Sequence, residues 1–177
     1  MKKELRRKLL EIRKNIKNKD EKSEKIAKTL LSQPFFEKAQ TIMVYLSYRD
    51  EVDTLRLIEE MLALGKRLCA PVCKSGGVMV AKEFRSINEL VSGAYGILEP
   101  QGEEIKDIDL IIVPGVGFNE SLHRIGYGAG YYDRFLQDFD SITCGLFYDE
   151  QRADFKEATH DLPLDYIITE TKILKRE

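Results

Sequence analysis

Residues 109–137 read DLIIVPGVGFNESLHRIGYGAGYYDRFLQ, and this stretch decides the fold class. It starts with the mostly apolar run 109–113, which is typical of a strand buried on both faces of a parallel sheet. Five of the twelve glycines follow between residues 115 and 130, and the sequence then predicts a helix over about 130–137. A buried strand, a glycine-rich loop and a helix in this order indicate an α/β protein.

Strands and helices alternate on both sides of this stretch, separated by breaks such as Gly65 and the Gln33-Pro34 step. We expect further strands over 41–46, 67–72, 78–84, 143–147 and 166–168, and further helices over the basic start, 21–31, 55–64 and 86–91. The alternation predicts one domain, residues 1–177, with three layers, in which helices cover both faces of a largely parallel sheet.

Composition excludes several classes of protein. The 177 residues are 43% hydrophobic and 33% charged with a net charge of −2, which indicates a globular rather than a disordered chain. No run approaches the roughly 20 apolar residues of a membrane span, and the start lacks the apolar segment of a secretory signal, so we expect a cytoplasmic protein.

The three cysteines, Cys69, Cys73 and Cys144, are expected to be plain buried thiols. With only His123, expected in a surface loop, and His160, any metal should be a hard, oxygen-bound cation.

The first 19 residues carry an unusual positive charge. They hold nine of the 28 basic residues and two of the 30 acidic ones, or +7, which leaves −9 for the rest of the chain. On a helix, one stripe is apolar and the opposite face is basic: Leu5, Leu9, Ile12 and Ile16 against Lys3, Arg7 and Lys14. The solvated face of an amphipathic helix, an arm for phosphates or nucleic acid, and a membrane-surface helix all fit this pattern.

The glycine-rich loop is suited to bind an anion. The spacing Gly126-x-Gly128-x-Gly130 lets backbone amides approach a phosphate, and the start of the following helix adds positive potential. This spacing matches neither the dinucleotide fingerprint nor the P-loop, so a plain glycine-rich turn also fits. Arg124 can bind phosphate oxygens with its guanidinium. Asp133 can hold a phosphate-bound Mg²⁺ or can simply complement the helix dipole.

A second polar segment follows the expected strand over 41–46. Residues 45–54 read YLSYRDEVDT and place Asp50 and Glu51 between the end of a strand and a capped helix. In open α/β sheets, ligands bind beyond the carboxyl ends of the strands. Spacing alone leaves two interpretations open, a carboxylate that binds substrate and a solvated turn.

Residues 124–134, RIGYGAGYYDR, together with Pro114-Gly115 and Phe118, closely resemble the signature of the 5-formyltetrahydrofolate cyclo-ligase (5,10-methenyltetrahydrofolate synthetase) family. The resemblance extends over nearly the whole chain: Lys3-x3-Arg7 at the start, 45–47 (YLS) with 51–54 (EVDT) in the middle, and 160–169 (HDLPLDYIIT) at the end. The chain departs from the family pattern at three positions: Asn119, where the family usually has Asp, Leu122, where it usually has Gly, and Ala129, where a second Gly or Lys is common.

The resemblance implies a reaction. It is the ATP- and Mg²⁺-dependent cyclisation of 5-formyltetrahydrofolate to 5,10-methenyltetrahydrofolate, with release of ADP and phosphate. A formamide oxygen is a poor leaving group, and its phosphorylation gives an iminophosphate that the neighbouring bridge nitrogen can attack. Such a reaction needs no protein nucleophile, because the protein positions the reactants and stabilises charge.

The resemblance also implies site residues, with Arg124 and Glu51 as catalytic residues and Asp133 and Asp165 as Mg²⁺ ligands. The substrate contacts that it implies are Leu46, Glu51, Tyr127, Gly128, Ala129, Gly130 and Tyr131. The ATP contacts that it implies are Lys3, Glu4, Leu5, Arg6, Arg7, Arg124, Ile125, Gly126, Tyr127, Gly128, Ala129, Gly130, Tyr131 and Tyr132.

Rival classes of function remain open. A non-catalytic folate- or nucleotide-binding protein would keep the same site without turnover. A nucleic-acid or membrane-surface protein would use the basic helix, but the slightly acidic composition and the absence of aromatic residues from 1–19 argue against it. We therefore expect small-molecule substrates, no nucleic-acid or membrane partner, and a monomer.

Overall fold

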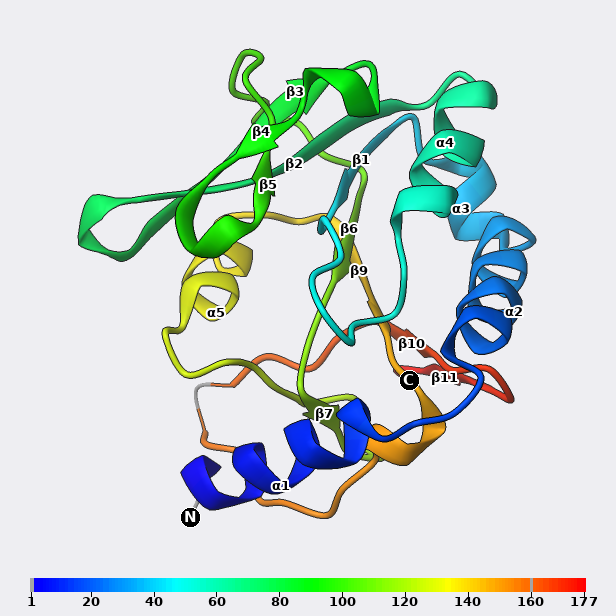
Figure 1. Ribbon diagram of the computed structural model, residues 1–177, viewed down its shortest axis with the longest axis vertical. Helices are drawn as coiled ribbons and strands as arrows, with labels where there is room; N and C mark the ends of the chain where they lie inside the picture. Colours follow the sequence, from blue (N-terminus) through cyan, green and yellow to red (C-terminus); the bar gives the residue numbers. More distant parts are fainter. Residues whose placement is uncertain (1, 160) are drawn as a thin grey trace.

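A seven-stranded sheet runs through the centre of the computed structural model, which describes residues 2–159 and 161–177 (Figure 1). From one edge to the other its strands are β11 (Ile173–Lys175), β10 (Tyr166–Ile168), β9 (Ile142–Leu146), β6 (Leu110–Val113), β1 (Thr41–Val44), β2 (Arg67–Lys74) and β3 (Val78–Phe84). The five inner strands are parallel, and the two edge strands run antiparallel to their neighbours. The predicted α/β class with a largely parallel sheet is confirmed. His160 of the closing motif lies outside the described residues.

Helices lie on both faces of this sheet. Successive strand residues point to opposite faces, so Ile42 and Val44 of β1 join one core cluster and Met43 joins the other. The first face is covered by α2 (Lys19–Leu31), α3 (Pro34–Lys38) and α4 (Leu55–Ala63), and the second by α5 (Tyr131–Leu136) together with loop residues (Figure 1). The three-layer architecture is therefore confirmed, with a single short helix on the second face.

Helix α4 illustrates how the local sequence sets these elements. Its buried residues Leu57, Ile58 and Met61 are spaced at i, i+1 and i+4, which places them on one face of a helix. Burial of each such side chain stabilises the fold by about 1.5–3 kcal/mol. The helix ends before Gly65, whose φ of 82° is a conformation that glycine adopts without steric cost.

Several short elements differ from the expectations. The predicted helix over 86–91 is wrong: a 3₁₀ turn at Ile87–Glu89 is followed by β4 (Val91–Ser92), which pairs with β5 (Leu98–Glu99). The sequence patterns also missed α3, β11 and the hairpin formed by β7 (Gly117–Phe118) and β8 (Arg124–Ile125). These missed elements are two to five residues long, too short for periodicity to reveal them.

Helix α1 (Lys2–Lys14) lies across the carboxyl ends of the parallel strands (Figure 1). Leu9 packs with Val116 and Ile125 in a small core cluster of their own. A Cβ added at Gly117 would stand 2.6 Å from the Leu9 Cδ1 atom, so the helix and the β7–β8 hairpin are in direct contact. The expected apolar stripe is partly wrong, because Ile12 is exposed and Arg13 is buried in its place.

Burial and hydropathy bear on the expectations drawn from composition. Within residues 2–159 and 161–177, no helix is long and apolar enough to cross a membrane. Cys69 and Cys144 are buried free thiols, and burial raises the pKa of Cys69 to about 12. Cys73 is exposed, so the expectation of a buried thiol is wrong there. His123 lies in a loop, but only 12% of its side chain is exposed, because Glu157 packs against it with 3.7 Å between Nδ1 and Oε1.

Candidate functional site

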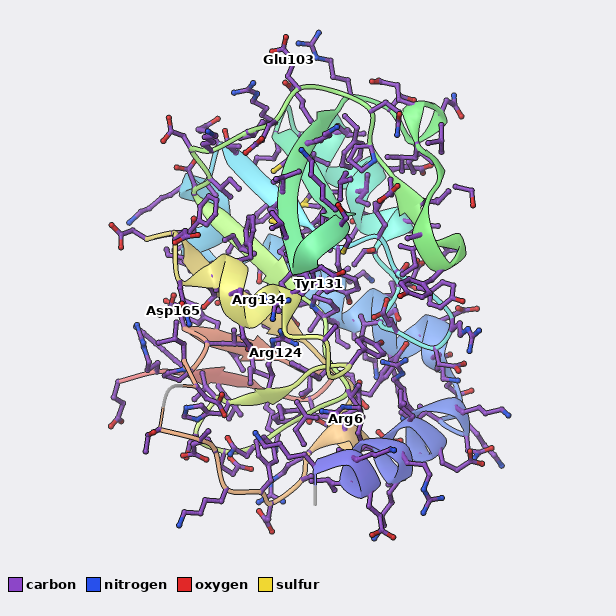
Figure 2. All side chains as sticks on the ribbon, turned by 90° about the vertical axis from the view of Figure 1, so that its left-hand side faces the viewer. Arg6, Glu103, Arg124, Tyr131, Arg134 and Asp165 are labelled. Carbon is purple, nitrogen blue, oxygen red and sulfur yellow. The ribbon has the colours of Figure 1, made fainter. Side chains whose placement is uncertain are left out.

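The glycine loop, residues 126–130, lies between β8 and α5. Its glycines at 128 and 130 have φ values of 107° and 74°, which L side chains rarely adopt. An arginine guanidinium lies close to each of the three alternate glycines. Measured to the point where a Cβ would stand, the distances are 2.9 Å for Arg124 at Gly126, 3.5 Å for Arg6 at Gly128 and 2.7 Å for Arg134 at Gly130. Three cations from three elements therefore line one bare backbone loop. Figure 2 shows them one below another, from Arg134 through Arg124 to Arg6.

Arg124 is held beneath the loop. Its side chain is 7% exposed, its Nη1 donates to the Pro114 carbonyl at 3.1 Å, and its Nη2 lies 3.8 Å from Asp133 Oδ1. The guanidinium carbon lies 5.1 Å from the centre of the Tyr132 ring. Burial lowers the pKa of Arg124 below its ordinary value, and Asp133 opposes this shift. The structure thus keeps a desolvated cation at the loop, where attraction to an anion is stronger than in water.

Among the α1 residues expected to bind ATP, Arg6 reaches the loop. Its Nε donates to the Gly126 carbonyl at 2.7 Å. Arg7 is exposed, with its Nη2 3.8 Å from Glu4 Oε1, and it lines a separate cavity of about 750 Å³ along the outer side of α1. Lys3 is exposed as well. Because successive helical residues are rotated by about 100°, α1 directs Arg6 and Arg7 to different sides.

Leu5, Ile125 and Tyr131 complete the placement of the expected ATP contacts. Leu5 is half-buried and packs in the small cluster beside the β7–β8 hairpin, in which Ile125 is buried. Tyr131 stands at the start of α5, and its ring centre lies 5.5 Å from the guanidinium carbon of Arg134. Leu5 and Ile125 therefore support the loop through core packing, whereas Tyr131 lies beside one of its cations.

Glu51 comes to the loop from the segment that follows β1. Its Oε2 accepts a hydrogen bond from the Tyr127 hydroxyl at 2.7 Å, and its Oε1 accepts one from the Tyr48 backbone N–H at 2.8 Å. Burial raises the pKa of Glu51, while these two hydrogen bonds and the charge of Arg13 lower it. Glu51 is thus a partly desolvated carboxylate beside the glycine loop, which favours the interpretation of this segment as a ligand site over that of a solvated turn.

The segment 47–54 is held in place by bonds between side chains and backbone. The Thr54 hydroxyl donates to the Tyr45 carbonyl at 2.7 Å and accepts from the Ser47 N–H at 3.0 Å. Leu46, an expected substrate contact, is 5% exposed and belongs to the core at the end of β1. Leu46 therefore supports the segment from below in this structure.

Arg13 is a site residue that sequence analysis missed. It is 4% exposed, and its Nη1 donates to the Tyr127 hydroxyl at 2.9 Å and to the Gly115 carbonyl at 3.3 Å. The available signal was its spacing, because Arg13 stands four residues after Leu9 and three before Ile16, both of which are buried. A basic residue inside an apolar stripe indicates a polar partner in the interior.

The two expected Mg²⁺ ligands lie at opposite ends of the parallel strands. Asp133 is 59% exposed in the first turn of α5, beside Arg124. Asp165 precedes β10, and its Oδ2 accepts from the Thr143 N–H at 2.9 Å while its Oδ1 lies 2.6 Å from Arg176 Nη2. Figure 2 shows Asp165 to one side of Arg124, beneath the far end of α5. The structure therefore leaves Asp133 available to a cation and engages Asp165 with protein groups.

Polar atoms without partners gather around the loop. Among the described residues, five buried side-chain atoms have no hydrogen-bond partner. Three of them belong to this region: Arg13 Nε, Arg124 Nε and the Tyr132 hydroxyl. Buried polar groups are nearly always satisfied, so the unpartnered Arg124 Nε and Tyr132 hydroxyl favour the interpretation of this region as a ligand site.

Two of the three departures from the family pattern belong to the turn between β7 and β8. Asn119 Oδ1 accepts from the backbone N–H groups of Ser121 at 3.0 Å and His123 at 3.1 Å, which organises this turn. Leu122 has a φ of 64°, a left-handed conformation that explains why glycine is usual at this position. Ala129 is exposed, and its carbonyl accepts from Arg134 Nη2 at 2.9 Å. Only the third departure lies in the glycine loop itself.

Fold and site together define an α/β protein with an arginine-lined glycine loop beside a partly desolvated carboxylate, where the parallel strands of the sheet end. A family model described as the 5-formyltetrahydrofolate cyclo-ligase family matches residues 1–170, and the chain belongs to that family. A probable 5-formyltetrahydrofolate cyclo-ligase of Schizosaccharomyces pombe is 31% identical over 88% of this chain and 87% of its own length. The 5-formyltetrahydrofolate cyclo-ligase of Escherichia coli K12 is 31% identical over 86% of this chain and 90% of its own length.

Solved structures agree with this membership. The 5,10-methenyltetrahydrofolate synthetase of Aquifex aeolicus superposes with a TM-score of 0.87 at 34% identity, covering 98% of this chain and 92% of its own. The enzyme of the same name from Mycoplasma pneumoniae gives a TM-score of 0.79 at 25% identity, covering 96% of this chain and 98% of its own. The family and the enzyme class predicted from the sequence, a cyclo-ligase, are confirmed.

Proposed function

We propose that this chain catalyses the ATP-dependent cyclisation of 5-formyltetrahydrofolate to 5,10-methenyltetrahydrofolate, with release of ADP and phosphate. The observation that carries the proposal is the set of three guanidiniums, from Arg6, Arg124 and Arg134, around the glycine loop, whose Tyr127 hydroxyl donates to Glu51. This arrangement suits a polyphosphate on one side and a polar organic substrate on the other. Family membership supports the choice of these two substrates.

The first step transfers the γ-phosphoryl group to the formyl oxygen. A P–O bond to that oxygen forms while the bond between the γ-phosphorus and the bridging oxygen breaks, and ADP leaves. The charge on the transferring group is met by donors that are already in place, namely the guanidiniums of Arg6 and Arg124 and the N–H groups of residues 126–130. Little covalent chemistry is required of the protein in such a transfer.

The second step closes the ring. The bridge nitrogen attacks the formyl carbon, loses its proton and forms the new C–N bond, and the C–O bond then breaks to release phosphate. Glu51 is the carboxylate that can accept this proton, because burial raises its pKa toward the range of an effective base. The Tyr127 hydroxyl, 2.7 Å from Glu51 Oε2, holds the carboxylate toward the loop.

A Mg²⁺ ion that accompanies ATP fits one residue of this site. Mg²⁺ is bound in such sites by one or two carboxylates together with phosphate oxygens, and it neutralises phosphate charge. Asp133 is exposed beside Arg124, so its carboxylate is free to meet a phosphate-bound cation. The Asp165 carboxylate is held by Thr143 and Arg176, so we assign the contact to Asp133 alone.

The test is to follow the absorbance of the methenyl product with the purified chain, 5-formyltetrahydrofolate, ATP and Mg²⁺, and to omit each component in turn. We expect product and ADP in equal amounts, and no product without ATP. Binding of both substrates by calorimetry with no product and no ADP would overturn the proposal in favour of a non-catalytic folate- or nucleotide-binding protein.

A further inference from the structure

Arg13 lies directly behind the pair formed by Tyr127 and Glu51. We infer that Arg13 is a positioning residue, which fixes the Tyr127 hydroxyl and through it the Glu51 carboxylate in the arrangement that the ring closure requires. This inference rests on the proposed function and adds a residue to it. The three side chains come from α1, the glycine loop and the segment after β1, and two consecutive hydrogen bonds join them.

The direction of these hydrogen bonds follows from the chemistry of the groups. A guanidinium can only donate, so the Tyr127 oxygen accepts from Arg13 Nη1 at 2.9 Å. The single hydroxyl proton of Tyr127 is then left for Glu51 Oε2 at 2.7 Å. Arg13 thereby fixes the orientation of the Tyr127 O–H bond, and the Glu51 carboxylate is the final acceptor of the two hydrogen bonds.

Burial separates Arg13 from any direct contact with substrate. Arg13 is 4% exposed, whereas Tyr127 is 50% exposed in front of it. The guanidinium carbon lies 5.6 Å from the centre of the Tyr127 ring, and Nη1 also donates to the Gly115 carbonyl at 3.3 Å. The guanidinium is therefore anchored to the backbone after β6 and acts on the reacting groups only through Tyr127.

Holding an arginine in this place is costly. A desolvated cation in the apolar stripe of α1 replaces a residue that could pack with Leu9 and Ile16, and its Nε has no hydrogen-bond partner. The charge of Arg13 lowers the pKa of both Glu51 and Tyr127, opposing the effect of burial on each group. A buried Arg13 that is linked to Glu51 through the Tyr127 hydroxyl is suited to keep the Glu51 carboxylate ionised and oriented.

The decisive experiment is a double-mutant cycle on turnover. Arg13→Met should lower kcat about tenfold to a hundredfold, as expected for loss of one hydrogen bond to a charged group, and should leave the KM for ATP within about twofold. In the Tyr127→Phe background the same change should lower kcat less than about twofold, because the hydroxyl through which Arg13 acts is already gone. Lys14→Met, an exposed neighbour on the same helix, is the matched control and should leave kcat unchanged.

Equal losses of kcat from Arg13→Met in the two backgrounds would overturn the inference, since a purely structural role for Arg13 is independent of the hydroxyl. Should Arg13→Met fail to fold, Arg13→Lys takes its place in the same cycle. Lysine keeps the charge but loses the planar fork of donors, so Arg13→Lys should lower kcat less than Arg13→Met does, and this loss should again disappear in the Tyr127→Phe background. Losses of the same size from Arg13→Lys in the two backgrounds would count against the inference in the same way.

A second readout does not depend on activity. With 3-fluorotyrosine at all eight tyrosines, the Tyr127 signal in the ¹⁹F spectrum is identified by its loss in Tyr127→Phe. Arg13→Met should shift this signal and leave the others in place, and an unshifted signal would overturn the inference. Absence of turnover in the parent protein would refute the proposed function alone, and the ¹⁹F shift would still decide whether Arg13 positions Tyr127.

Discussion

The parallel strands of the sheet all begin at one side of it, here called the amino edge, and all end at the opposite side, the carboxyl edge. Acidic residues lie just outside the strands at both of these edges, but their surroundings differ. At the amino edge, Asp109 Oδ2 accepts from the N–H groups of Gln40 and Thr41, both at 2.9 Å, and these bonds lower the pKa of Asp109. At the carboxyl edge, burial raises the pKa of Glu51. The amino edge thus stabilises its carboxylate as an anion, whereas the carboxyl edge leaves one partly destabilised.

The difference follows from the polarity of parallel strands. Their amino ends leave N–H groups without partners, and a carboxylate satisfies them, as Asp109 does. Their carboxyl ends leave carbonyls, and guanidiniums satisfy those, as Arg124 does at Pro114 and Arg13 does at Gly115. A guanidinium has five donors, so donors remain for a ligand after the carbonyls are satisfied. The cationic site at the carboxyl edge and the carboxylate at the amino edge therefore have the same cause, which is that unpaired backbone groups at the ends of the strands need hydrogen-bond partners.

Arg124→Ala tests this reasoning with the largest expected effect. Loss of one preorganised donor to a developing oxyanion typically costs about 10²–10³ in rate, and we expect turnover to fall by at least this factor. The measurement is kcat/KM for ATP in the methenyl absorbance assay, with urea unfolding as a check on the fold. A folded variant with parental turnover at subsaturating ATP would mean that the loop is only a turn between a strand and a helix.

Glu51→Gln should lower turnover by about a hundredfold and leave ATP binding nearly intact. Glutamine keeps the shape and the hydrogen bond from Tyr48 but cannot accept a proton, and removal of a positioned base typically costs about 10²–10⁴ in rate. Calorimetry with ATP and with 5-formyltetrahydrofolate separates the two substrates. Loss of ATP binding would place Glu51 in the nucleotide site and contradict the role assigned to it.

Asp133→Asn and Asp165→Asn compare the two edges directly. An amide is a neutral and weaker ligand for Mg²⁺, so Asp133→Asn should lose about tenfold in turnover at low Mg²⁺ and recover as Mg²⁺ is raised. Asp165→Asn should keep the parental Mg²⁺ dependence and lose stability, because its partners are Thr143 and Arg176. A Mg²⁺ titration of both variants decides the matter. A shifted Mg²⁺ requirement in Asp165→Asn would restore that residue to the metal site.

The sheet could be predicted from the sequence because its strands carry strong local signals. The run Leu110–Val113 is buried at every position, and the expected strands at 78–84 and 166–168 match β3 and β10. The hairpin of β7 and β8 could not be predicted, since it consists of two-residue strands held by the distant Leu9. Hydrophobic periodicity reveals only helices and strands long enough to repeat the pattern, so the position of shorter elements depends on tertiary contacts that the local sequence does not show.

The site was predictable where its residues are adjacent in sequence. The glycine loop, Arg124 and Asp133 fall within ten residues, and the two charged residues favoured an anion site where the glycine spacing alone also fitted a plain turn. Arg13 was not predictable in this way, because its partners Tyr127 and Gly115 lie more than 100 residues away. A helical stripe is read by hydropathy, which assigns an arginine to the solvent face unless a buried partner is known.

Arg6→Ala and Arg7→Ala should separate two neighbouring residues that sequence analysis treated alike. Arg6 donates to the Gly126 carbonyl, whereas Arg7 is exposed beside Glu4. We expect Arg6→Ala to raise the KM for ATP by about fivefold to tenfold, the effect of one partly screened charged contact, and Arg7→Ala by less than twofold. A larger effect of Arg7→Ala would show that α1 rotates toward the loop when ATP binds.

Asp109→Asn tests the amino edge, where the expected effect is smallest and concerns stability. The Asp109 pKa is lowered from 3.8 in the folded protein, so its contribution is present above that value and is lost as the pH falls through the folded pKa. Asparagine can still accept from Gln40 and Thr41, so we expect a loss of about 1 kcal/mol in the free energy of unfolding at pH 7.

Urea unfolding of the parent and of Asp109→Asn at pH 7 and at pH 3 measures this contribution, with the exposed Asp107→Asn as the control. The difference between parent and Asp109→Asn should shrink at pH 3, because the parent carboxylate becomes protonated and resembles the amide in charge. If the free energies of unfolding of the parent and of Asp109→Asn differ by the same amount at both pH values, the charge of Asp109 does not contribute, and only its hydrogen bonds to Gln40 and Thr41 matter. The contrast between the two edges of the sheet would then lie only in the cations of the carboxyl edge.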